Sequence, residues 1–152
     1  METLQALEKL RQICSRQEKC PADIVALLKR WGIDQGHHQE IIRKLISERF
    51  IDEHRYAAAF VRDKTSFDHW GMIKIRYFLQ QKGIAKAASD KAIGEIDQDE
   101  YRKMVGKELA KKRKSLKGSP REIWAKLARY GSSRGYEMEI MHDFLGETAL
   151  EN

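Results

Sequence analysis

The sequence predicts an all-α fold of three tandem three-helix repeats that form an elongated, curved array. Apolar residues recur three and four positions apart along most of the chain, which is the pattern of amphipathic helices. Glycines follow three of these apolar stripes at intervals of 51 and 48 residues, a period typical of helical repeats. A unit of about fifty residues buries too little apolar surface to be stable alone, so we expect neighbouring repeats to support one another.

The first repeat is expected over residues 1–51, with its first helix over residues 2–17. Pro21 suits the first position of a second helix, because the amide it lacks would have no partner there. Gly32 ends that helix, since glycine readily adopts the left-handed conformation of a helix C-terminus. A third helix follows a polar corner. The residues expected to face the core are Leu4, Leu7, Leu10, Cys14, Ile24, Leu27, Leu28, Ile41, Ile42, Leu45 and Ile46.

The second repeat is expected over residues 52–98. Asp52 is a candidate N-cap, because its carboxylate can accept from the free amides of the first helical turn. The helix it opens runs to about residue 66, and Asp68 is expected to cap the next one, which Gly83 ends. Gly94 weakens a short sixth helix. The residues expected to face the core are Tyr56, Ala59, Phe60, Ile75, Phe78, Leu79, Ile93 and Ile96.

The third repeat is expected over residues 99–152 and opens with a long basic helix. The run Ser119-Pro120-Arg121-Glu122 has the pattern of a capping box with proline at the first helical position. Gly131 is expected to end the helix that follows, and residues 146–152 are expected to fray. The core residues expected here are Met104, Val105, Leu109, Ile123, Trp124, Leu127, Ile140, Met141, Phe144 and Leu145.

The three repeats align without gaps when Gly32, Gly83 and Gly131 are superimposed. Eight residues before these glycines stand Ile24, Ile75 and Ile123, and four residues before them stand Leu28, Leu79 and Leu127. Equivalent positions after the glycines are also almost all apolar. This agreement is the basis for expecting three copies of one helical unit.

The composition excludes several classes of function. No apolar run is long enough for a membrane span or a signal peptide, so we expect a cytoplasmic protein with no membrane contact. We also expect a monomer. Cys14 and Cys20 do not form a CxxC pair, and His37 and His38 have no further ligands beside them, so we expect no metal site. No nucleophile with an adjacent base and no glycine-rich phosphate loop is visible. We therefore expect neither catalysis nor a cofactor.

Basic residues are concentrated in the third repeat. Between Arg102 and Arg134 there are twelve Lys and Arg residues and only two acids, in a chain of net charge +6. We hypothesise that the densest part contacts phosphates or an acidic protein surface. The alternative is a solvated helix end, where cations are favourable. The candidate contact residues are Lys111, Lys112, Arg113, Lys114, Lys117, Arg121, Lys126 and Arg129.

A sparser basic set lies in the second repeat, and for it a contact role and an ordinary solvated surface remain equally open. Its members are Arg62, Lys64, Lys74, Arg76 and Lys82. Trp31, Trp70 and Trp124 each stand at a helix end or beside an apolar stripe. We interpret them as packing residues rather than as platforms for base stacking.

One stretch of the second repeat carries a family resemblance. It reads Phe50-Ile51-Asp52-Glu53, Arg55-Tyr56-Ala57 and Phe60-Val61-Arg62, then Gly71, Ile75, Leu79 and finally Lys82-Gly83-Ile84. In this it resembles the RecX family of regulators of the bacterial recombinase RecA. Two positions depart from the family pattern, because Met72 stands where a proline is frequent and Phe78 where a glutamate is frequent. Phe78 either deepens the core or exposes an aromatic ring to a partner, so the family's contact residues are not carried over onto this helix.

The resemblance implies three tandem three-helix repeats and a non-enzymatic protein. It implies binding in the groove of the RecA filament on single-stranded DNA, with possible direct contact to DNA. Such binding limits filament growth, ATP hydrolysis and strand exchange. The alternative from the residues alone is a helix-turn-helix transcription factor, which sequence-selective binding to duplex DNA would favour.

Overall fold

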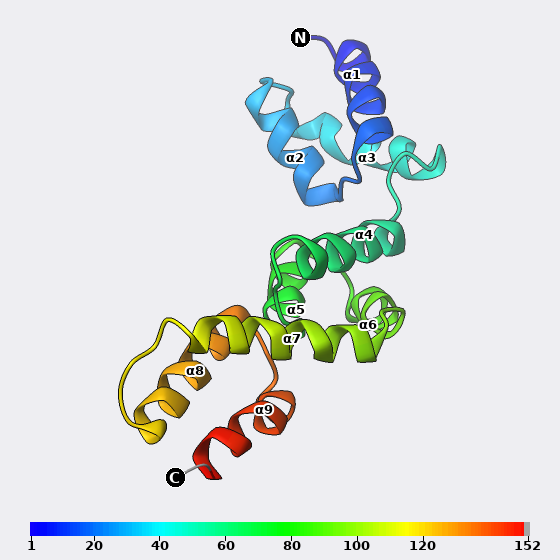
Figure 1. Cartoon of the computed structure of the whole chain (residues 1–152). Helices are drawn as coiled ribbons and strands as arrows, with labels where there is room; N and C mark the ends of the chain where they lie inside the picture. Colours follow the sequence, from blue (N-terminus) through cyan, green and yellow to red (C-terminus); the bar gives the residue numbers. More distant parts are fainter. Residues whose placement is uncertain (151–152) are drawn as a thin grey trace. The chain divides into compact units, whose positions relative to one another are not determined.

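The computed structural model describes the backbone of residues 1–150 and the side chains of residues 1–145. This part of the chain is helical throughout and holds no strand, which confirms the predicted all-α class (Figure 1). The elements are α1 (Thr3–Arg16), α2 (Pro21–Arg30), the 3-10 turn η1 (Gln35–His37), α3 (His38–Ser47), α4 (Glu53–Ser66), α5 (Met72–Gln81), α6 (Lys86–Gly94), α7 (Gln98–Arg113), α8 (Pro120–Arg134) and α9 (Met138–Leu150).

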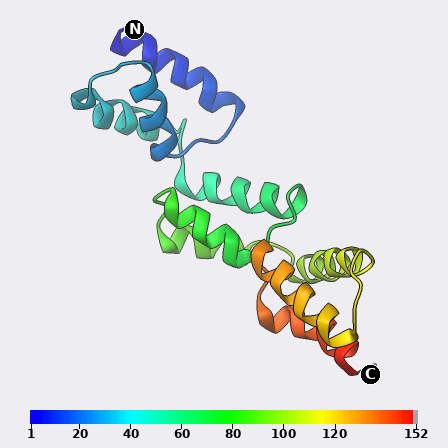
Figure 2. The ribbon, with the colours of Figure 1, turned by 90° about the vertical axis from the view of Figure 1, so that its left-hand side faces the viewer.

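Packing divides the chain into two compact units. One contains Met1–Ala59 and Leu79–Ala92, and the other contains Phe60–Phe78 and Ile93–Asn152. Figure 2 shows α1 to α3 grouped in the first unit and α7 to α9 grouped in the second. Helices α4 and α5 contribute to both units, so the repeat boundaries expected from the sequence remain predictions. Fraying was expected at residues 146–152. The side chains of residues 146–150 and all of residues 151–152 lie outside the described part of the chain.

The core of the first unit confirms most of the apolar stripes and corrects their edges. Leu4 is 77% exposed and Ile46 is 51% exposed, although both were expected to face inward. At 3.6 residues per turn, each lies about 100° around its helix from the centre of the buried face, beyond the part that neighbouring helices cover. The buried residues are Ala6, Leu7, Leu10, Cys14, Ile24, Leu28, Ile33, Ile41, Ile42, Leu45 and Ile51.

The predicted helix starts are correct where capping chemistry is local. Asp52 caps α4, since its Oδ1 accepts the amide of Arg55 at 2.8 Å, and Ser119 accepts the amide of Glu122 at the start of α8. Asp68 does not cap α5. Its carboxylate pairs with Lys64 at 3.2 Å, and α5 begins four residues later at Met72.

Two of the three predicted stop glycines are confirmed. Gly32 and Gly83 have φ values of 72° and 77° in the left-handed region. Gly131 was wrongly expected to end α8, which continues to Arg134 and is closed by Gly135 at φ 91°. Gly131 is instead buried within the helix. A Cβ there would lie 2.1 Å from Sδ of Met141, so the missing side chain lets α9 approach α8.

The hydrogen bonds at these helix ends give the correct alignment of the repeats. The amides of Ile33, Ile84 and Tyr136 donate to the carbonyls of the residues five positions earlier, at 3.0, 3.0 and 2.9 Å. The equivalent of Gly32 and Gly83 is therefore Gly135, and the third repeat shifts by four residues from the predicted alignment. The corrected intervals are 51 and 52 residues. Gly131 then stands where the other repeats bury a leucine.

In the second unit, the segment before α5 crosses the end of α8 at backbone distance. The amide of Gly71 donates to the carbonyl of Arg134 at 2.7 Å, and the amide of Ile73 donates to that of Gly135 at 3.0 Å. The amide of Met72 donates to the hydroxyl of Tyr101 at 3.1 Å. Burial and a hydrogen bond to Glu137 raise the pKa of Tyr101, so its hydroxyl stays protonated over the neutral pH range.

In the first unit, Lys82 and Asp23 form an ion pair across 59 residues of sequence. Nζ of Lys82 lies 2.5 Å from Oδ1 of Asp23, whose carboxylate is 15% exposed. Oδ2 of Asp23 accepts from the amide and the thiol of Cys20 at 3.1 and 3.3 Å. Burial raises the pKa of Asp23, but the hydrogen bonds from Lys82 and Cys20 outweigh it and leave the pKa below its ordinary value.

Gly71→Ala is expected to lower the free energy of unfolding by about 1–3 kcal/mol, the usual cost of an atom forced into a packed site. The new Cβ would lie 2.1 Å from the carbonyl oxygen of Gly135, and neither backbone can yield without breaking their hydrogen bonds. Gly94→Ala is the matched control, since its Cβ would meet no atom within 4 Å. Urea unfolding of the two variants tests this, and equal stabilities would contradict it.

Asp23→Asn is expected to lower stability at neutral pH by about 1 kcal/mol, because the charge-assisted bond to Lys82 is lost. The pKa of Asp23 is lowered on folding, so its contribution is present above its unfolded pKa of about 4 and disappears as the pH falls through the folded value. The variant should therefore approach the wild-type stability in acid. Urea unfolding at pH 7 and below pH 4 measures this. The exposed Asp34→Asn, whose side chain makes no cap bond, is the control, and parallel wild-type and Asp23→Asn curves would refute the pairing.

Candidate functional site

The structure separates the predicted basic residues by whether a partner compensates their charge. Lys82 is committed to Asp23 within the first unit. Lys64 pairs with Asp68, and Arg62 lies 3.9 Å from the carboxylate of its neighbour Asp63. These contacts favour a structural role for Lys82 and an ordinary surface role for Arg62. Arg76 is exposed on α5.

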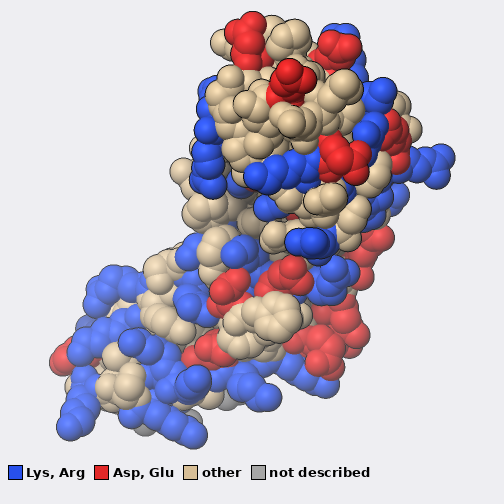
Figure 3. Space-filling model, turned by 90° about the horizontal axis from the view of Figure 1, so that it is seen from above, with Lys and Arg blue, Asp and Glu red and all other residues tan. Residues whose placement is uncertain are grey.

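The predicted basic residues of the third repeat lie at the end of α7, in the following loop and on α8. We call this set the α7–α8 basic surface. Figure 3 shows Lys and Arg crowded on the left-hand side, where Figure 1 draws the end of α7 and α8. Its exposed members are Lys111, Arg113, Lys114, Lys117, Arg121, Lys126 and Arg129, and its half-buried member is Lys112.

Most charges of the α7–α8 basic surface have no acidic partner in the described part of the chain. No carboxylate there forms an ion pair with Lys111, Lys114 or Lys117. Lys126 donates to the backbone carbonyl of Lys117 at 3.1 Å, which ties the loop to α8. Within the described residues, the site therefore presents the ammonium groups of Lys111, Lys114 and Lys117 without a compensating carboxylate.

The helix dipole explains only part of this surface. Lys111, Lys112 and Arg113 occupy the last turn of α7, where cations are favourable. Arg121 occupies the first turn of α8, where a cation is unfavourable. Because the same surface gathers cations at both kinds of helix end, a solvated C-terminus is an incomplete explanation. The anionic partner predicted for these residues therefore stays a prediction, which the dipole alone does not replace.

A hollow of about 560 Å³ lies beside the basic surface within the second unit. It brings the end of α7 together with the turn that follows α4 and with the last turns of α8. Two acidic residues, Asp68 and Glu108, also line the hollow. The carboxylate of Glu108 lies 3.6 Å from Nε2 of His69. The lining residues are Phe67, Asp68, His69, Glu108, Lys111, Lys112, Ser115, Tyr130 and Arg134.

Sequence reasoning missed Arg134 and Tyr130 in this hollow. The guanidinium of Arg134 lies 5.8 Å from the centre of the Tyr130 ring and donates to the backbone carbonyl of Asp68. The ammonium of Lys112 lies 5.2 Å from the same ring. The signal for Arg134 was its place as the last basic residue before an acidic C-terminal stretch. No sequence signal marked Tyr130 as the ring between two cations.

A second group of basic and aromatic side chains lies on the end of α4, the turn that follows it and α5 as far as Phe78, within the second unit. The ammonium groups of Lys64 and Lys74 lie 4.6 and 4.3 Å from the centre of the Trp70 ring. For Phe78 the sequence leaves open core packing and exposure to a partner; the side chain is 38% exposed and its ring lies 5.0 Å from that of Trp70. Trp70 itself is half-buried, so it packs on one side and faces these cations on the other.

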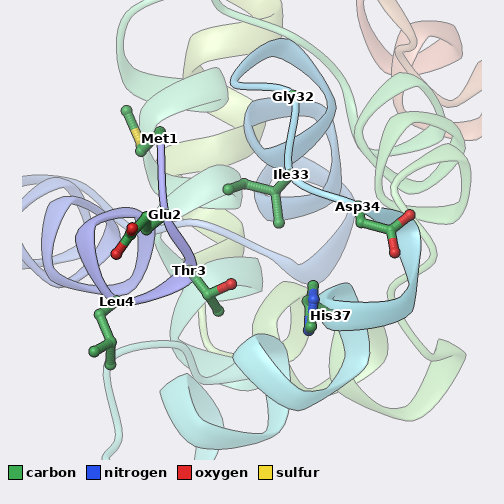
Figure 4. A pocket seen from close by; sticks show the side chains of 8 residues that line it. All are labelled: Met1, Glu2, Thr3, Leu4, Gly32, Ile33, Asp34 and His37. Carbon is green, nitrogen blue, oxygen red and sulfur yellow. The ribbon is translucent and has the colours of Figure 1, made fainter.

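The first unit has a separate hollow of about 400 Å³ (Figure 4). It lies between the start of α1 and the turn after α2, and its lining includes Glu2, Asp34 and His37. Glu2 is the N-cap residue of α1, and its amide donates to Oε1 of Gln5 at 3.0 Å, so this end of the hollow is part of the helix cap. The lining shows no arrangement of acid, base and nucleophile that suggests a reaction.

Metal and thiol chemistry find no support in the described residues. No group of three or more His, Cys, Asp and Glu side chains is placed to hold a metal ion there. Cys14 and Cys20 are both buried free thiols. Burial raises the pKa of each, so both thiols stay protonated and poorly nucleophilic near neutral pH. Among the described helices, none combines the length and apolar character needed to cross a bilayer.

Two family models match this chain. The model described as RecX, second three-helix domain, matches residues 52–93, and the model described as RecX, third three-helix domain, matches residues 99–145. Together they cover more than half of the sequence. The matched ranges include both groups of basic residues described above. Neither family description assigns a role to any of these residues.

Curated relatives and solved structures point to the same family. Regulatory protein RecX of Clostridium tetani is 29% identical over 76% of this chain, and that of Limosilactobacillus reuteri is 34% identical over 70%. The chain spans 54% and 39% of the lengths of these two relatives. Regulatory protein RecX of Prosthecochloris aestuarii is 26% identical, with 96% of this chain and 95% of the relative covered.

Among solved structures, a crystal structure of regulatory protein RecX superimposes with a TM-score of 0.84 at 25% identity, covering 93% of this chain and 71% of that one. RecX from Lactobacillus salivarius superimposes with a TM-score of 0.75 at 21% identity, covering 97% and 99%, which supports the fold alone. The predicted fold of RecX three-helix domains is thereby confirmed. The chain belongs to the RecX family of regulatory proteins.

Proposed function

We propose that this chain is a non-enzymatic modulator, mainly an inhibitor, of the RecA recombinase. It binds the RecA filament on single-stranded DNA and limits filament growth, ATP hydrolysis and recombinase activity. The partners are the RecA filament and the DNA strand within it, and the protein acts as a monomer in the cytoplasm, in DNA repair by homologous recombination and in the SOS response.

Family membership carries this proposal, and the α7–α8 basic surface supplies the physical support. A filament on single-stranded DNA is a polyanion, and uncompensated cations bind it by releasing its counterions. The same cations can meet acidic protein surface, which raises the rate of association and orients the complex. Both contacts are binding contacts, so the proposed action is binding to the filament and its strand.

The direct test is the DNA-dependent ATP hydrolysis of RecA. Saturating amounts of this chain added to RecA filaments on single-stranded DNA should lower the hydrolysis rate several-fold, because bound chain limits the length of active filament. The chain alone should hydrolyse no ATP, and heat-unfolded chain serves as the control for nonspecific effects. An unchanged hydrolysis rate at saturating amounts of this chain would contradict the proposal.

The basic surface is tested by charge reversal at three exposed members that have no acidic partner in the described residues. The variant Lys111→Glu, Lys114→Glu, Lys117→Glu lowers the formal net charge from +6 by 6, to 0. If each lysine contacts one phosphate, the slope of log affinity against log salt should flatten by about 2, at about 0.7 per contact. Binding to the filament should weaken at least about tenfold at low salt. Titration by fluorescence anisotropy from about 50 to 200 mM salt measures both.

The matched control is Arg16→Glu, Lys29→Glu, Arg43→Glu. These three side chains are exposed in the first unit, and no carboxylate of the described chain forms an ion pair with them. This variant has the same net charge of 0, from +6 − 6. If both variants lose the same affinity, net charge rather than the α7–α8 basic surface governs binding.

A further inference from the structure

Helix α5 carries exposed aromatic rings on the side away from its buried residues. Ile75 and Leu79 are fully buried, whereas Tyr77 is 55% exposed and Phe78 is 38% exposed. At 100° per residue, Tyr77 points almost opposite to the buried pair, and Phe78 lies at the border. Exposed rings in isolation are common, but these two are adjacent and in contact with a third.

The rings form one continuous row. Tyr77 meets Phe78 edge-on, with centres 5.3 Å apart at 88°, and Phe78 is tilted by 40° against Trp70 at 5.0 Å. Phe60 supports Trp70 from α4 with an edge contact at 6.3 Å. The row therefore leads from a half-buried, supported ring to one that is open to solvent. We call Trp70, Tyr77 and Phe78 the α5 aromatic row.

The turn before α5 fixes the position of Trp70. His69 has a φ of 55°, and the amide of Trp70 then donates to the carbonyl of Lys64 at 2.9 Å. The hydroxyl of Tyr136 donates a hydrogen bond to the carbonyl of His69 at 2.6 Å. Because backbone and side-chain bonds both hold this turn, the Trp70 ring is preorganised rather than mobile, which lowers the entropy lost when a ligand binds.

Two ammonium groups flank the row. The ammonium of Lys64 pairs with Asp68 and also lies over Trp70, so part of its charge is compensated. For Lys74, the Trp70 ring is the sole partner within the described residues. An apolar protein partner would have to remove water from both ammonium groups without replacing it. A nucleic-acid strand supplies phosphates for them and flat rings for the row.

We propose that the α5 aromatic row, with Lys64 and Lys74, is a contact site for unpaired bases of single-stranded DNA. The bases stack on the exposed rings of Tyr77 and Phe78. Trp70, whose ring already carries the two ammonium groups, supports Phe78, and the flanking phosphates meet those ammonium groups. Bases within a duplex are already stacked and cannot reach such a row, so the site selects single strands. This inference rests on the proposed function only in that the filament would be the source of the strand.

The test compares a labelled oligothymidylate with an abasic oligonucleotide of the same length, at one salt concentration and without RecA. The wild-type chain should prefer the oligonucleotide that carries bases. Tyr77→Ala and Phe78→Ala should each weaken oligothymidylate binding about fivefold or more and leave abasic binding nearly unchanged, since only the stacking is lost. Tyr77→Phe should keep wild-type binding because it keeps the ring.

Ile73→Ala is the control, because Ile73 is 56% exposed on the same helix but has no ring. Its binding should equal that of the wild type, and circular dichroism verifies that every variant is folded. Equal binding of the two oligonucleotides by the wild type, or full binding by the ring variants, would overturn the inference.

The same variants in the RecA hydrolysis assay separate this inference from the proposed function. Ring variants that keep base-dependent binding but lose the effect on RecA would assign the row to a protein contact, against this inference. A wild-type chain that discriminates bases but does not affect RecA would support the inference and count against the proposed function.

Discussion

The second unit depends on the place where the backbones at Gly71 and Gly135 cross. Gly71 and Ile73 donate to the carbonyls of Arg134 and Gly135, so the start of α5 completes the end of α8. Helix ends normally leave such carbonyls for water or a cap. Here a distant segment satisfies them, and no side chain fits between. The turn that carries Trp70, the hollow beside Arg134 and the direction of α5 all follow from this one crossing.

Local chemistry in the sequence was enough to predict the helical class and most helix starts. Asp52 and Ser119 act within their own first turns, so their roles are visible without knowing the fold. Gly131 shows the limit of that approach. A glycine that ends a helix and a glycine that admits Met141 from another helix look the same in one sequence, and only the packing tells them apart. Leu4 and Ile46 failed for the related reason that neighbours decide which edge of an apolar stripe is covered.

Only part of the candidate site could be predicted from the sequence. Charge density along the chain revealed the cations at the end of α7, because it is a property of neighbouring residues. Which cations are already compensated depends on acids far away, as with Lys82 and Asp23. For Phe78 the sequence left burial and exposure both open, since an aromatic at the border of a buried face can turn either way, and the structure exposes it. The structure thus directs attention from individual basic residues to two surfaces. One is the α7–α8 basic surface, and the other combines ammonium groups with aromatic rings.

The ion pair between Asp23 and Lys82 bears on how freely such repeats can be exchanged. Lys82 stands in the stretch that resembles the family pattern, yet its counter-charge Asp23 lies 59 residues earlier, in the predicted first repeat. A chimera that takes either repeat from another chain inherits half of a matched pair. It leaves a largely buried carboxylate facing a foreign side chain, or an ammonium with nothing opposite. The repeats look interchangeable from their spacing in the sequence. The predicted repeats that carry Asp23 and Lys82 nevertheless have to be transferred together to keep this ion pair.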